Sequence, residues 1–394
     1  MAIGPRTKTL QSRLFRRGQE YQDQRRGGDL TGKRSQPARR RKHLYLVLDD
    51  WEKGFSVHKI DTDSFDSDSD DDDDRDGGVA VAGHLPDPAL RLESPGGADM
   101  SFAAMGSKIF IVTDARYGQT PVLVYDVETA GLAIGPAVPA QLRCGFSTVV
   151  AAREMLYAFS PPACNKQHSF YVMSCTPTGS HDPGGEGWSW RSLLAPPPPF
   201  DIYEIITSYA VHSDGRTIFM TTSYSDRPGL QKSTYSFNTK YCVWRWHPWV
   251  LPFRGQGYFD SELDAWVGLH KDGYICSCEL PSDIGSETPI ELGTMELDWQ
   301  MAEDKFSRKE TERHLRASLT YLGRSKFCLL QSVMRKGSKA KYPLGDDGGC
   351  VLHLTIFGLK YNNKGELCTT NHKSSRSYRV TRHTDFFPPV AFWV

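Results

Sequence analysis

The chain has 394 residues and a formal net charge of zero, because 47 basic residues balance 47 acidic residues. This balance excludes a global field that would attract nucleic acid or an anionic membrane. No apolar run is long enough to cross a bilayer and the N-terminus lacks the apolar core of a secretory signal, so we expect no membrane partner. The 9 cysteines lack the paired spacing of a secreted disulfide framework. We therefore expect reduced thiols and a cytoplasmic or nuclear protein.

Residues 1–42 are rich in Arg, Gln and Gly and contain few apolar side chains. Such a segment buries too little apolar surface to offset the entropy lost on ordering, so we predict a disordered basic arm. The arm ends in a compact cluster that fits a nuclear-import signal, made of Arg39, Arg40, Arg41 and Lys42. Two alternatives are a solubilising tail and an organelle transit peptide over Thr7–Arg17, although Glu20 and Asp23 weigh against the transit peptide.

Residues 43–60 alternate apolar and polar side chains around a turn at residues 49–54, which predicts a β-hairpin. An acidic tract follows, and we predict a disordered loop over residues 62–78 because so many like charges cannot be buried together. Three serines of this tract are candidate sites for acid-directed kinases, namely Ser64, Ser67 and Ser69. The alternative is a flexible insertion that carries no modification.

A repeated unit of four short strands begins at residue 100. The 35 Gly and 24 Pro residues punctuate short aromatic or β-branched runs, as is typical of strands joined by turns. The first strand of successive units begins near Met100, Phe146, Ile206, Gly257 and Arg316. The units are thus about 46 to 60 residues apart, which is the blade period of a kelch-type β-propeller. In the unit that begins near Gly257, the fourth strand is expected over residues 290–298.

The two ends of the chain complete the repeat. Residues 43–86 supply three strands without a first one, and residues 386–394 supply a single strand. We predict one all-β domain over residues 43–394, a six-bladed propeller in which strands from both termini close one blade. Seven blades are the alternative if residues 299–316 contain further strands. By length and charge pattern, Trp299–Arg316 is also the segment that indicates a helix.

Four segments carry a family resemblance: VYDVETAGLAIGPAVP, SYAVHSDGRTIF, STYSFNT and WVLPFRGQGYFDSELDAWVGL. Over residues 43–394 the chain resembles a family of uncharacterised plant proteins, mainly from cereals, with a kelch-like domain of unknown function. That family is related in pattern to the propellers of F-box kelch proteins. The resemblance implies a propeller fold and no particular reaction. Residues 1–42 are too short and too polar to be an F-box.

The chain departs from the kelch pattern at one position and matches it at others. The pattern places a glycine pair after the second strand of a blade, where this chain has Val, Thr and Asp at residues 112–114. Tyr125 matches the tyrosine position of the pattern, and Trp188 and Trp244 match its tryptophan position. The departure puts strict kelch membership in question and leaves the propeller prediction intact.

Six aromatic residues stand on the predicted strands and are expected to pack between blades: Tyr125, Trp188, Trp190, Trp244, Trp246 and Trp266. In the two tryptophan pairs, a spacing of two directs both rings to one face of a strand. Packing is our interpretation because large aromatic rings at equivalent positions bury much apolar area. The alternative is an aromatic platform for a ligand or a peptide.

We predict no catalytic residue, no cofactor and no metal site. Cys276 and Cys278 share a strand face, but zinc needs four convergent ligands and no second pair lies at a usual spacing. The histidines at 168, 181, 212, 247 and 270 are scattered, and no Gly-rich phosphate loop, GxSxG or HExxH motif occurs. The basic residues at 335, 336, 339 and 341 have Tyr342 alone for stacking, so a solvated loop is expected rather than nucleic-acid binding.

We therefore expect a monomeric, non-catalytic interaction module that binds a protein partner through loops on a propeller face. The alternative is an enzyme, or a binder of carbohydrate or another small ligand, that uses the mouth of the central channel. A ligand or metal retained through purification would favour the alternative.

Overall fold

The computed structural model describes residues 41–65, 82–94, 100–113, 120–142, 148–160, 169–176, 187–193, 198–201, 203–224, 231–280, 297–305, 314–334, 349–380 and 389–394. The chain divides into two units, Met1–Arg41 and Lys42–Val394. Residues 1–40, most of the predicted disordered arm, lie outside the described residues. The described structure is therefore that of the second unit.

The described strands form six four-stranded antiparallel groups. Group 1 contains β25 (Val390–Trp393), β1 (Leu44–Trp51), β2 (Gly54–Ile60) and β4 (Pro88–Glu93). Group 2 contains β5 (Met100–Met105), β6 (Lys108–Thr113), β7 (Pro121–Asp126) and β8 (Gly131–Ala137). Group 3 contains β9 (Thr148–Ala152), β10 (Met155–Ser160), β11 (Ser169–Thr176) and β12 (Gly187–Ser192).

Groups 4 to 6 follow in the same order. Group 4 contains β13 (Glu204–Val211), β14 (Thr217–Tyr224), β15 (Gln231–Asn238) and β16 (Val243–His247). Group 5 contains β17 (Arg254–Asp260), β18 (Ala265–Leu269), β19 (Tyr274–Glu279) and β20 (Asp298–Lys305). Group 6 contains β21 (His314–Gly323), β22 (Lys326–Met334), β23 (Cys350–Tyr361) and β24 (Leu367–Val380), and β3 (Gly83–His84) pairs in parallel with β24.

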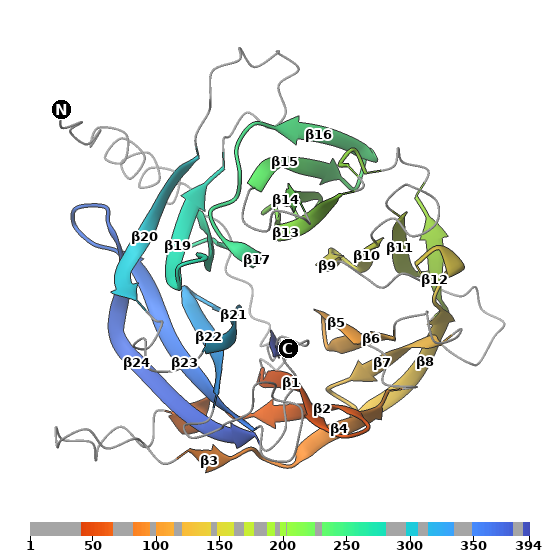
Figure 1. Cartoon of the computed structure of the whole chain (residues 1–394), viewed down its shortest axis with the longest axis horizontal. Coiled ribbons are helices and arrows are strands. Elements are labelled where there is room, and N and C mark those ends of the chain that lie inside the picture. The colour runs from red at the N-terminus through yellow and green to blue at the C-terminus, as the bar shows by residue number, and fades with distance from the viewer. Residues whose placement is uncertain are drawn as a thin grey trace, which may run out of the picture. The chain divides into compact units, whose positions relative to one another are not determined.

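The groups lie side by side around a common centre, with the first strand of each innermost and the fourth outermost (Figure 1). The buried apolar clusters join neighbouring groups. Phe110 of group 2 packs with Leu156 of group 3, and Leu46 of group 1 packs with Leu330 of group 6. Sheets that pack face to face around a centre form a β-propeller. The predicted all-β propeller fold is confirmed.

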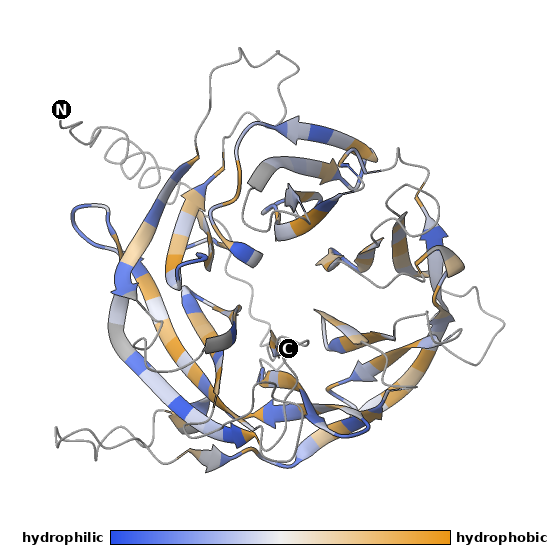
Figure 2. Cartoon of the chain, viewed as in Figure 1, coloured by the Kyte–Doolittle hydropathy of each residue, from blue (hydrophilic) through white to orange (hydrophobic). Residues whose placement is uncertain are grey.

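Burial follows the position of each strand in its group. In β6 the run from Ile109 to Thr113 is buried, because a middle strand has a neighbouring group on both faces. In β8, an outer strand, most side chains are exposed or half-buried. Figure 2 shows hydrophobic residues along the inner and middle strands and hydrophilic blocks on β16 and β24. Gly106, with φ of 60°, makes the tight turn between β5 and β6.

Strands from the two ends of the described chain close the ring. β25 pairs antiparallel with β1, with Leu44 opposite Trp393 and Val47 opposite Val390. Two main-chain hydrogen bonds extend this pairing, since His43 N donates to Val394 O at 2.9 Å and Val394 N donates to His43 O at 3.2 Å. The pairing removes the open inner edge that β1 would otherwise present.

Groups 4 and 5 are joined more closely than the other groups. β13 and β17 pair in parallel, with Tyr209 opposite Gln256, so the two groups share one eight-stranded sheet. The connection between them carries Phe253, which is 1% exposed. Its ring lies against Gly257 and Gly268, and a Cβ at either glycine would overlap the ring. Both positions therefore require glycine.

The helix predicted over Trp299–Arg316 is wrong. Residues 298–305 form β20, and the described chain resumes in β21 at residue 314. The fourth strand expected over residues 290–298 is displaced too, because β20 begins at Asp298. β20 is an outer strand in which Glu303 and Asp304 are exposed while Ala302 is buried. Charged side chains are thus exposed on both faces of β20, and the lack of a clean alternation produced the helix-like pattern.

The start of the acidic tract lies in a short 3-10 helix, η1 (Asp63–Phe65). Phe65 is buried in the cluster between groups 6 and 1. Residues 66–78 of the predicted loop lie outside the described residues. β4 begins at Pro88, later than the limit of residue 86 expected for the fourth strand of this group. In the described part of the chain, no helix is long and apolar enough to span a membrane.

Candidate functional site

A row of hydrogen-bonding aromatic side chains crosses the innermost strands of groups 4, 5 and 6. The Tyr209 hydroxyl on β13 donates to Gln256 Oε1 on β17 at 3.2 Å. The ring of Tyr258 on β17 lies 6.2 Å from the ring of Tyr321 on β21, measured between centroids. We call Tyr209, Gln256, Tyr258 and Tyr321 the tyrosine row. Parallel pairing of β13 and β17 places Tyr209 opposite Gln256, which explains the hydrogen bond between them.

The phenols of the tyrosine row are neutral at physiological pH. Burial raises the pKa of Tyr209 to about 12. Burial also raises the pKa of Tyr258, with a smaller contribution from the neighbouring Tyr209. The pKa of Tyr321 rises to about 12, because the ring is desolvated and because its hydroxyl bonds to the Asp260 carboxylate. These hydroxyls can therefore exchange hydrogen bonds with a ligand at neutral pH without acting as phenolate bases.

Asp260, at the end of β17, links groups 5 and 6 by hydrogen bonds. Its side chain is fully buried, and its Oδ2 accepts a hydrogen bond from Ser325 N at 2.8 Å. Its Oδ1 accepts from the Ser325 hydroxyl at 2.9 Å and from Leu263 N at 2.8 Å. A buried carboxylate with this many donors is well satisfied, so Asp260 has a structural role.

The interior of group 4 is unusually polar. Glu204 on β13 is fully buried, and its Oε2 accepts a hydrogen bond from the Thr222 hydroxyl at 2.9 Å. The hydroxyls of Thr221 and Thr234 lie 2.7 Å apart. Three further buried hydroxyls have no hydrogen-bond partner among the described residues, those of Ser208, Ser223 and Ser233. Buried hydroxyls of this kind are normally satisfied by water or by a polar ligand.

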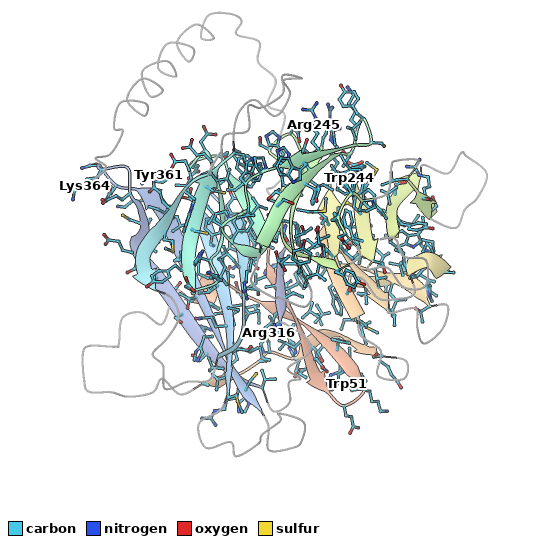
Figure 3. The ribbon with its side chains drawn as sticks, turned by 45° about the horizontal axis from the view of Figure 1, so that its top comes forward. Trp51, Trp244, Arg245, Arg316, Tyr361 and Lys364 are labelled. Carbon is cyan, nitrogen blue, oxygen red and sulfur yellow. The ribbon has the colours of Figure 1, made fainter. Side chains whose placement is uncertain are left out.

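Two of the predicted packing tryptophans lie between groups. The Trp188 ring of group 3 stands edge-on to Phe110 of group 2, with centroids 5.0 Å apart. The Trp244 ring of group 4 is 5.6 Å from Phe170 of group 3. Figure 3 shows Trp244 on β16 among the side chains of neighbouring strands. Both rings fill interfaces between neighbouring sheets.

The other predicted aromatics differ in exposure. Tyr125 is 3% exposed between groups 1 and 2, and the Trp266 indole of group 5 donates to Val211 O of group 4 at 3.3 Å. Trp190 is half-buried beside the cluster of groups 2 and 3. Trp246 is 57% exposed, which does not fit a packing role. Its place near the end of the outermost strand leaves the ring without a neighbouring sheet to cover it.

Most of the charged and modifiable residues predicted from the sequence lie outside the described part. Arg41 and Lys42 are exposed at its beginning, while Arg39 and Arg40 precede it. Ser64 lies in η1, and Ser67 and Ser69 lie outside the described residues, as does the basic loop at 335–341. The structure brings none of these residues together with the tyrosine row in its described part.

The cysteines and histidines form no described metal centre. Burial raises the pKa of the Cys276 thiol to about 12 and raises that of Cys278 as well, so both are inert thiols at neutral pH. Histidines 168 and 181 lie outside the described residues, while the rings of His212 and His270 stack on tryptophans. No group of three or more His, Cys, Asp or Glu side chains suited to a metal ion occurs in the described part.

The sequence interpretation missed the tyrosine row, although a signal for it was present. Tyr209, Tyr258 and Tyr321 each lie in the first strand of three successive units, in the strings SYAVH, GYFDSE and LTYLG. A residue type that recurs on consecutive innermost strands gathers near the axis of a propeller. Each tyrosine stands alone within its own unit, so only its recurrence across neighbouring units indicates the row.

Comparisons with known proteins identify a family and solved structures of distantly similar fold. A family model described as "Protein of unknown function (DUF1668)" matches residues 41–378. No curated protein matches the chain significantly. Among solved structures, the chain is similar to Hsv2 of Kluyveromyces lactis, with 9% identity and a TM-score of 0.38 over 84% of this chain and 82% of that one.

Two further structures give similar values. The periplasmic gluconolactonase PpgL of Pseudomonas aeruginosa has 9% identity and a TM-score of 0.39, over 86% of this chain and 99% of that one. Apo AztD from Citrobacter koseri has 10% identity and a TM-score of 0.38, over 90% of this chain and 97% of that one. Likenesses this distant carry no information about ligand or activity.

Proposed function

The chain belongs to the DUF1668 family of proteins of unknown function, and we propose that it is a protein-interaction module that binds a partner through the connections at a propeller face. The observation that carries this proposal is the set of buried contacts that join neighbouring groups. Asp260 bonds group 5 to Ser325 of group 6, and the buried ring of Phe253 fills the contact between groups 4 and 5. Sheets joined in this way suit a scaffold that presents its connections to a partner.

Connections of two kinds meet the two edges of the ring. One edge carries turns such as that at Asn362, whose Oδ1 accepts from Lys364 N at 2.8 Å, together with the longer connections from β2 to β4, from β11 to β12 and from β19 to β20. The opposite edge carries the connections from each fourth strand to the next group, together with those from β10 to β11 and from β22 to β23. Figure 3 shows Lys364 and Trp51, which lie at turns of the two kinds, on opposite sides of the view. We assign partner binding to the edge that carries the connections between groups.

The test is to replace individual connections between strands and to measure whether a partner still binds. Affinity purification with cross-linking mass spectrometry would compare the full chain with variants in which residues 161–168 or 335–348 are replaced by short Gly/Ser linkers. A matched control replaces Asn362–Glu366, a turn on the other edge. The proposal expects a cross-linked partner that is lost with either loop and kept with the control. Unchanged cross-links in both loop variants would contradict it.

A second candidate function rests on the tyrosine row. Neutral phenols beside the Gln256 carboxamide suit a small, hydroxyl-bearing ligand such as a carbohydrate, which aromatic rings and hydroxyls bind together. A glycan array followed by calorimetry would test it, with Tyr209→Phe and Gln256→Ala as variants. Saturable binding that both variants weaken supports the ligand role, and an array without any hit argues for the protein partner.

We also propose that each four-stranded group is one blade, which gives a six-bladed propeller of kelch-like type. The joining of β25 to β1 and the sharing of a cluster between groups 6 and 1 support this count. The protein is proposed to be a monomer of the cytoplasm or nucleus. Fluorescence microscopy of the tagged chain, with Arg39–Lys42 changed to alanine, tests whether the basic cluster directs nuclear import.

A further inference from the structure

Three arginines lie near one end of the contact between groups 3 and 4, which are neighbours in the ring (Figure 1). Arg153 is in the turn between β9 and β10, Arg191 is on β12, and Arg216 ends the turn between β13 and β14. Arg153 and Arg191 are exposed, and Arg216 is half-buried. We call these three residues the arginine corner.

The two arginines of group 3 lie beside the hydroxyl of Tyr157 on β10. Arg191 Nη2 donates to Ser174 Oγ at 3.1 Å. Ser174 stands opposite Met155, whose Sδ accepts a weak hydrogen bond from the Tyr157 hydroxyl at 3.7 Å. Burial raises the pKa of Tyr157, while the charges of Arg191 and Arg153 oppose this rise. Both guanidinium groups are therefore close to one phenol.

Group 4 reaches the same place from its own sheet. Contact with the Thr239 side chain also opposes the burial that raises the pKa of Tyr157, so Thr239 lies beside the same hydroxyl. Thr239 N donates to Arg216 O at 2.8 Å, which extends the pairing of β14 with β15. Arg216 is two residues before Ile218, which is buried in the cluster between groups 3 and 4. Because alternate side chains share a face, Arg216 faces group 3.

Arg153 spans the gap between the two groups. Its Cγ lies 3.5 Å from the position that a Cβ would occupy at Gly215, the residue before Arg216. The side chain of Arg153 thus crosses from its own turn to the turn between β13 and β14. Arginines from two sheets therefore gather around the hydroxyls of Tyr157 and Thr239.

No carboxylate neutralises the arginine corner among the residues that the structure describes. The hydrogen bond of Arg191 goes to a neutral hydroxyl, which leaves its charge in place. The ion pairs of the described residues include neither Arg153 nor Arg216. A cluster of like charges without a counterion is electrostatically suited to an anion.

The acidic residues next to the corner in sequence, Glu154 and Asp214, are directed elsewhere. Asp214 Oδ1 accepts from Arg216 N at 2.6 Å and its Oδ2 accepts from the Thr217 hydroxyl at 3.2 Å. Asp214 Oδ1 also lies 3.3 Å from Nδ1 of His212, whose ring stacks on a tryptophan of group 5. Glu154 comes just before β10, whose first side chain packs towards group 4, so alternation directs Glu154 to the other face.

The turn that carries Thr239 adds an exposed aromatic ring beside the corner. Tyr241 is 66% exposed, and Lys240 Nζ lies 4.9 Å from the centre of its ring. The ring offers apolar contact to whatever is attached to an anion in the corner. This favours an anion that is part of a larger molecule over a free ion.

The chemistry of the corner selects a phosphate group. A guanidinium donates two parallel hydrogen bonds to phosphate oxygens, and the Tyr157 and Thr239 hydroxyls can donate further ones. A phosphorylated side chain carries close to two negative charges at neutral pH, whereas a carboxylate carries one, so the phosphate gains more from several arginines. We propose that the arginine corner binds a phosphorylated serine or threonine of another protein, with Tyr241 in contact with the residues beside it.

This site lies on the edge of the ring that carries the turn at Asn362, opposite the edge proposed above to bind a partner. Either proposal can therefore fail without the other. The inference adds a second binding surface and states the chemistry that it recognises.

The test uses the immobilised full chain and a library of nine-residue peptides with a fixed central phosphoserine and random flanking residues. The phosphorylated library should be retained at least tenfold more than the same library with plain serine. A fluorescein-labelled peptide chosen from the retained pool should bind saturably in anisotropy titration, and phosphatase treatment of that peptide should abolish binding. Equal retention of the two libraries would overturn the proposal.

Variants locate the binding. Arg153→Ala and Arg216→Ala should each weaken binding of the selected peptide at least fivefold, and Arg153→Lys should weaken it less because lysine keeps the charge without the fork. Arg324→Ala is the matched control and should leave binding unchanged, since Arg324 is also an exposed turn residue and has a φ of 53°, against 54° for Arg153. Circular dichroism checks that each variant is folded. Unchanged binding in both corner variants, or an equal loss in Arg324→Ala, would contradict the assignment.

Three other occupants are distinguished by further outcomes, each of which would overturn the proposal. Inorganic phosphate that binds as tightly as the selected peptide in calorimetry would assign the corner to the free ion. Binding to vesicles that contain a phosphoinositide, without retention of phosphopeptides, would assign it to a membrane. At least tenfold tighter peptide binding after deletion of residues 66–78 would assign it to the acidic tract of the chain itself.

Discussion

Acid should destabilise the protein through His247. This residue ends β16 and is 7% exposed. Its Nε2 lies 2.8 Å from the Ser236 hydroxyl, and its ring stacks on Trp249. Burial, and secondarily the charge of Arg245, lowers its pKa from 6.5 to about 4. The folded protein therefore keeps a neutral imidazole under conditions in which the unfolded chain binds a proton.

The sign and size of the effect follow from the two pKa values. The folded pKa is the lower one, so this contribution to stability is complete above pH 6.5 and is lost as the pH falls towards 4. Each unit of difference corresponds to about 1.4 kcal/mol, so the contribution is on the order of 3 kcal/mol. Loss of this size is a large share of the net stability of a typical domain.

The assay is urea denaturation at pH 7 and pH 4, followed by tryptophan fluorescence, for the wild type and for His247→Gln. Glutamine keeps a donor for Ser236 and does not titrate, so the drop in unfolding free energy between the two pH values should be about 3 kcal/mol smaller in the variant. Other titrating groups contribute equally to both proteins. Arg245→Gln should raise the His247 pKa, read from its NMR titration. Equal drops in the wild type and His247→Gln would refute the reasoning.

Four other changes have expected outcomes. Gly257→Ala should lower the unfolding free energy by about 1 to 3 kcal/mol because its methyl group meets the far end of the Phe253 ring; Phe253→Leu in the same chain removes those ring atoms and should restore part of it, and additive losses would contradict the clash. Above pH 10 the fold should lose stability, because Tyr209, with its pKa of about 12, resists ionisation only when folded; Tyr209→Phe should reduce this loss in alkaline denaturation. Asp260→Asn should lower the unfolding free energy by about 2 kcal/mol because it disrupts the hydrogen bonds between groups 5 and 6. Urea denaturation measures this loss, and an unfolding free energy equal to that of the wild type would contradict the linking role of Asp260. Trp244→Ala should cost about 3 to 5 kcal/mol, and thermal unfolding unchanged from the wild type would contradict its packing role.

The strands that were predicted well from the sequence are those in which both faces have the same environment. The middle strand β6 reads as a continuous apolar run because both of its faces are buried, and its place in the repeat was visible from that run. β20 was missed because its faces differ. Ala302 is buried against group 6, while Trp299 and Met301 are exposed. Such a strand carries both charged and apolar side chains without clean alternation, and its pattern overlaps with that of a helix.

Contacts between units escaped prediction for a different reason. The parallel pairing of β13 with β17, which sets Tyr209 opposite Gln256, depends on how closely two sheets approach at the axis. The glycines that allow the approach of Phe253, Gly257 and Gly268, look like ordinary turn or strand glycines in the sequence. Periodicity reports which face of a strand is buried, and it does not report which strand of another unit lies opposite.

The joining of β25 to β1 ties the order of synthesis to the order of folding. Leu44–Trp51 leaves the ribosome early, while its inner partner, Val390–Trp393, is made more than 300 residues later. Domains generally fold from the N-terminus as they are synthesised. For this chain the inner edge of β1 has no native partner during almost all of that time, and an uncovered strand edge invites wrong pairing. A nascent chain that stalls before residue 390 is therefore a natural client for chaperones that cover strand edges.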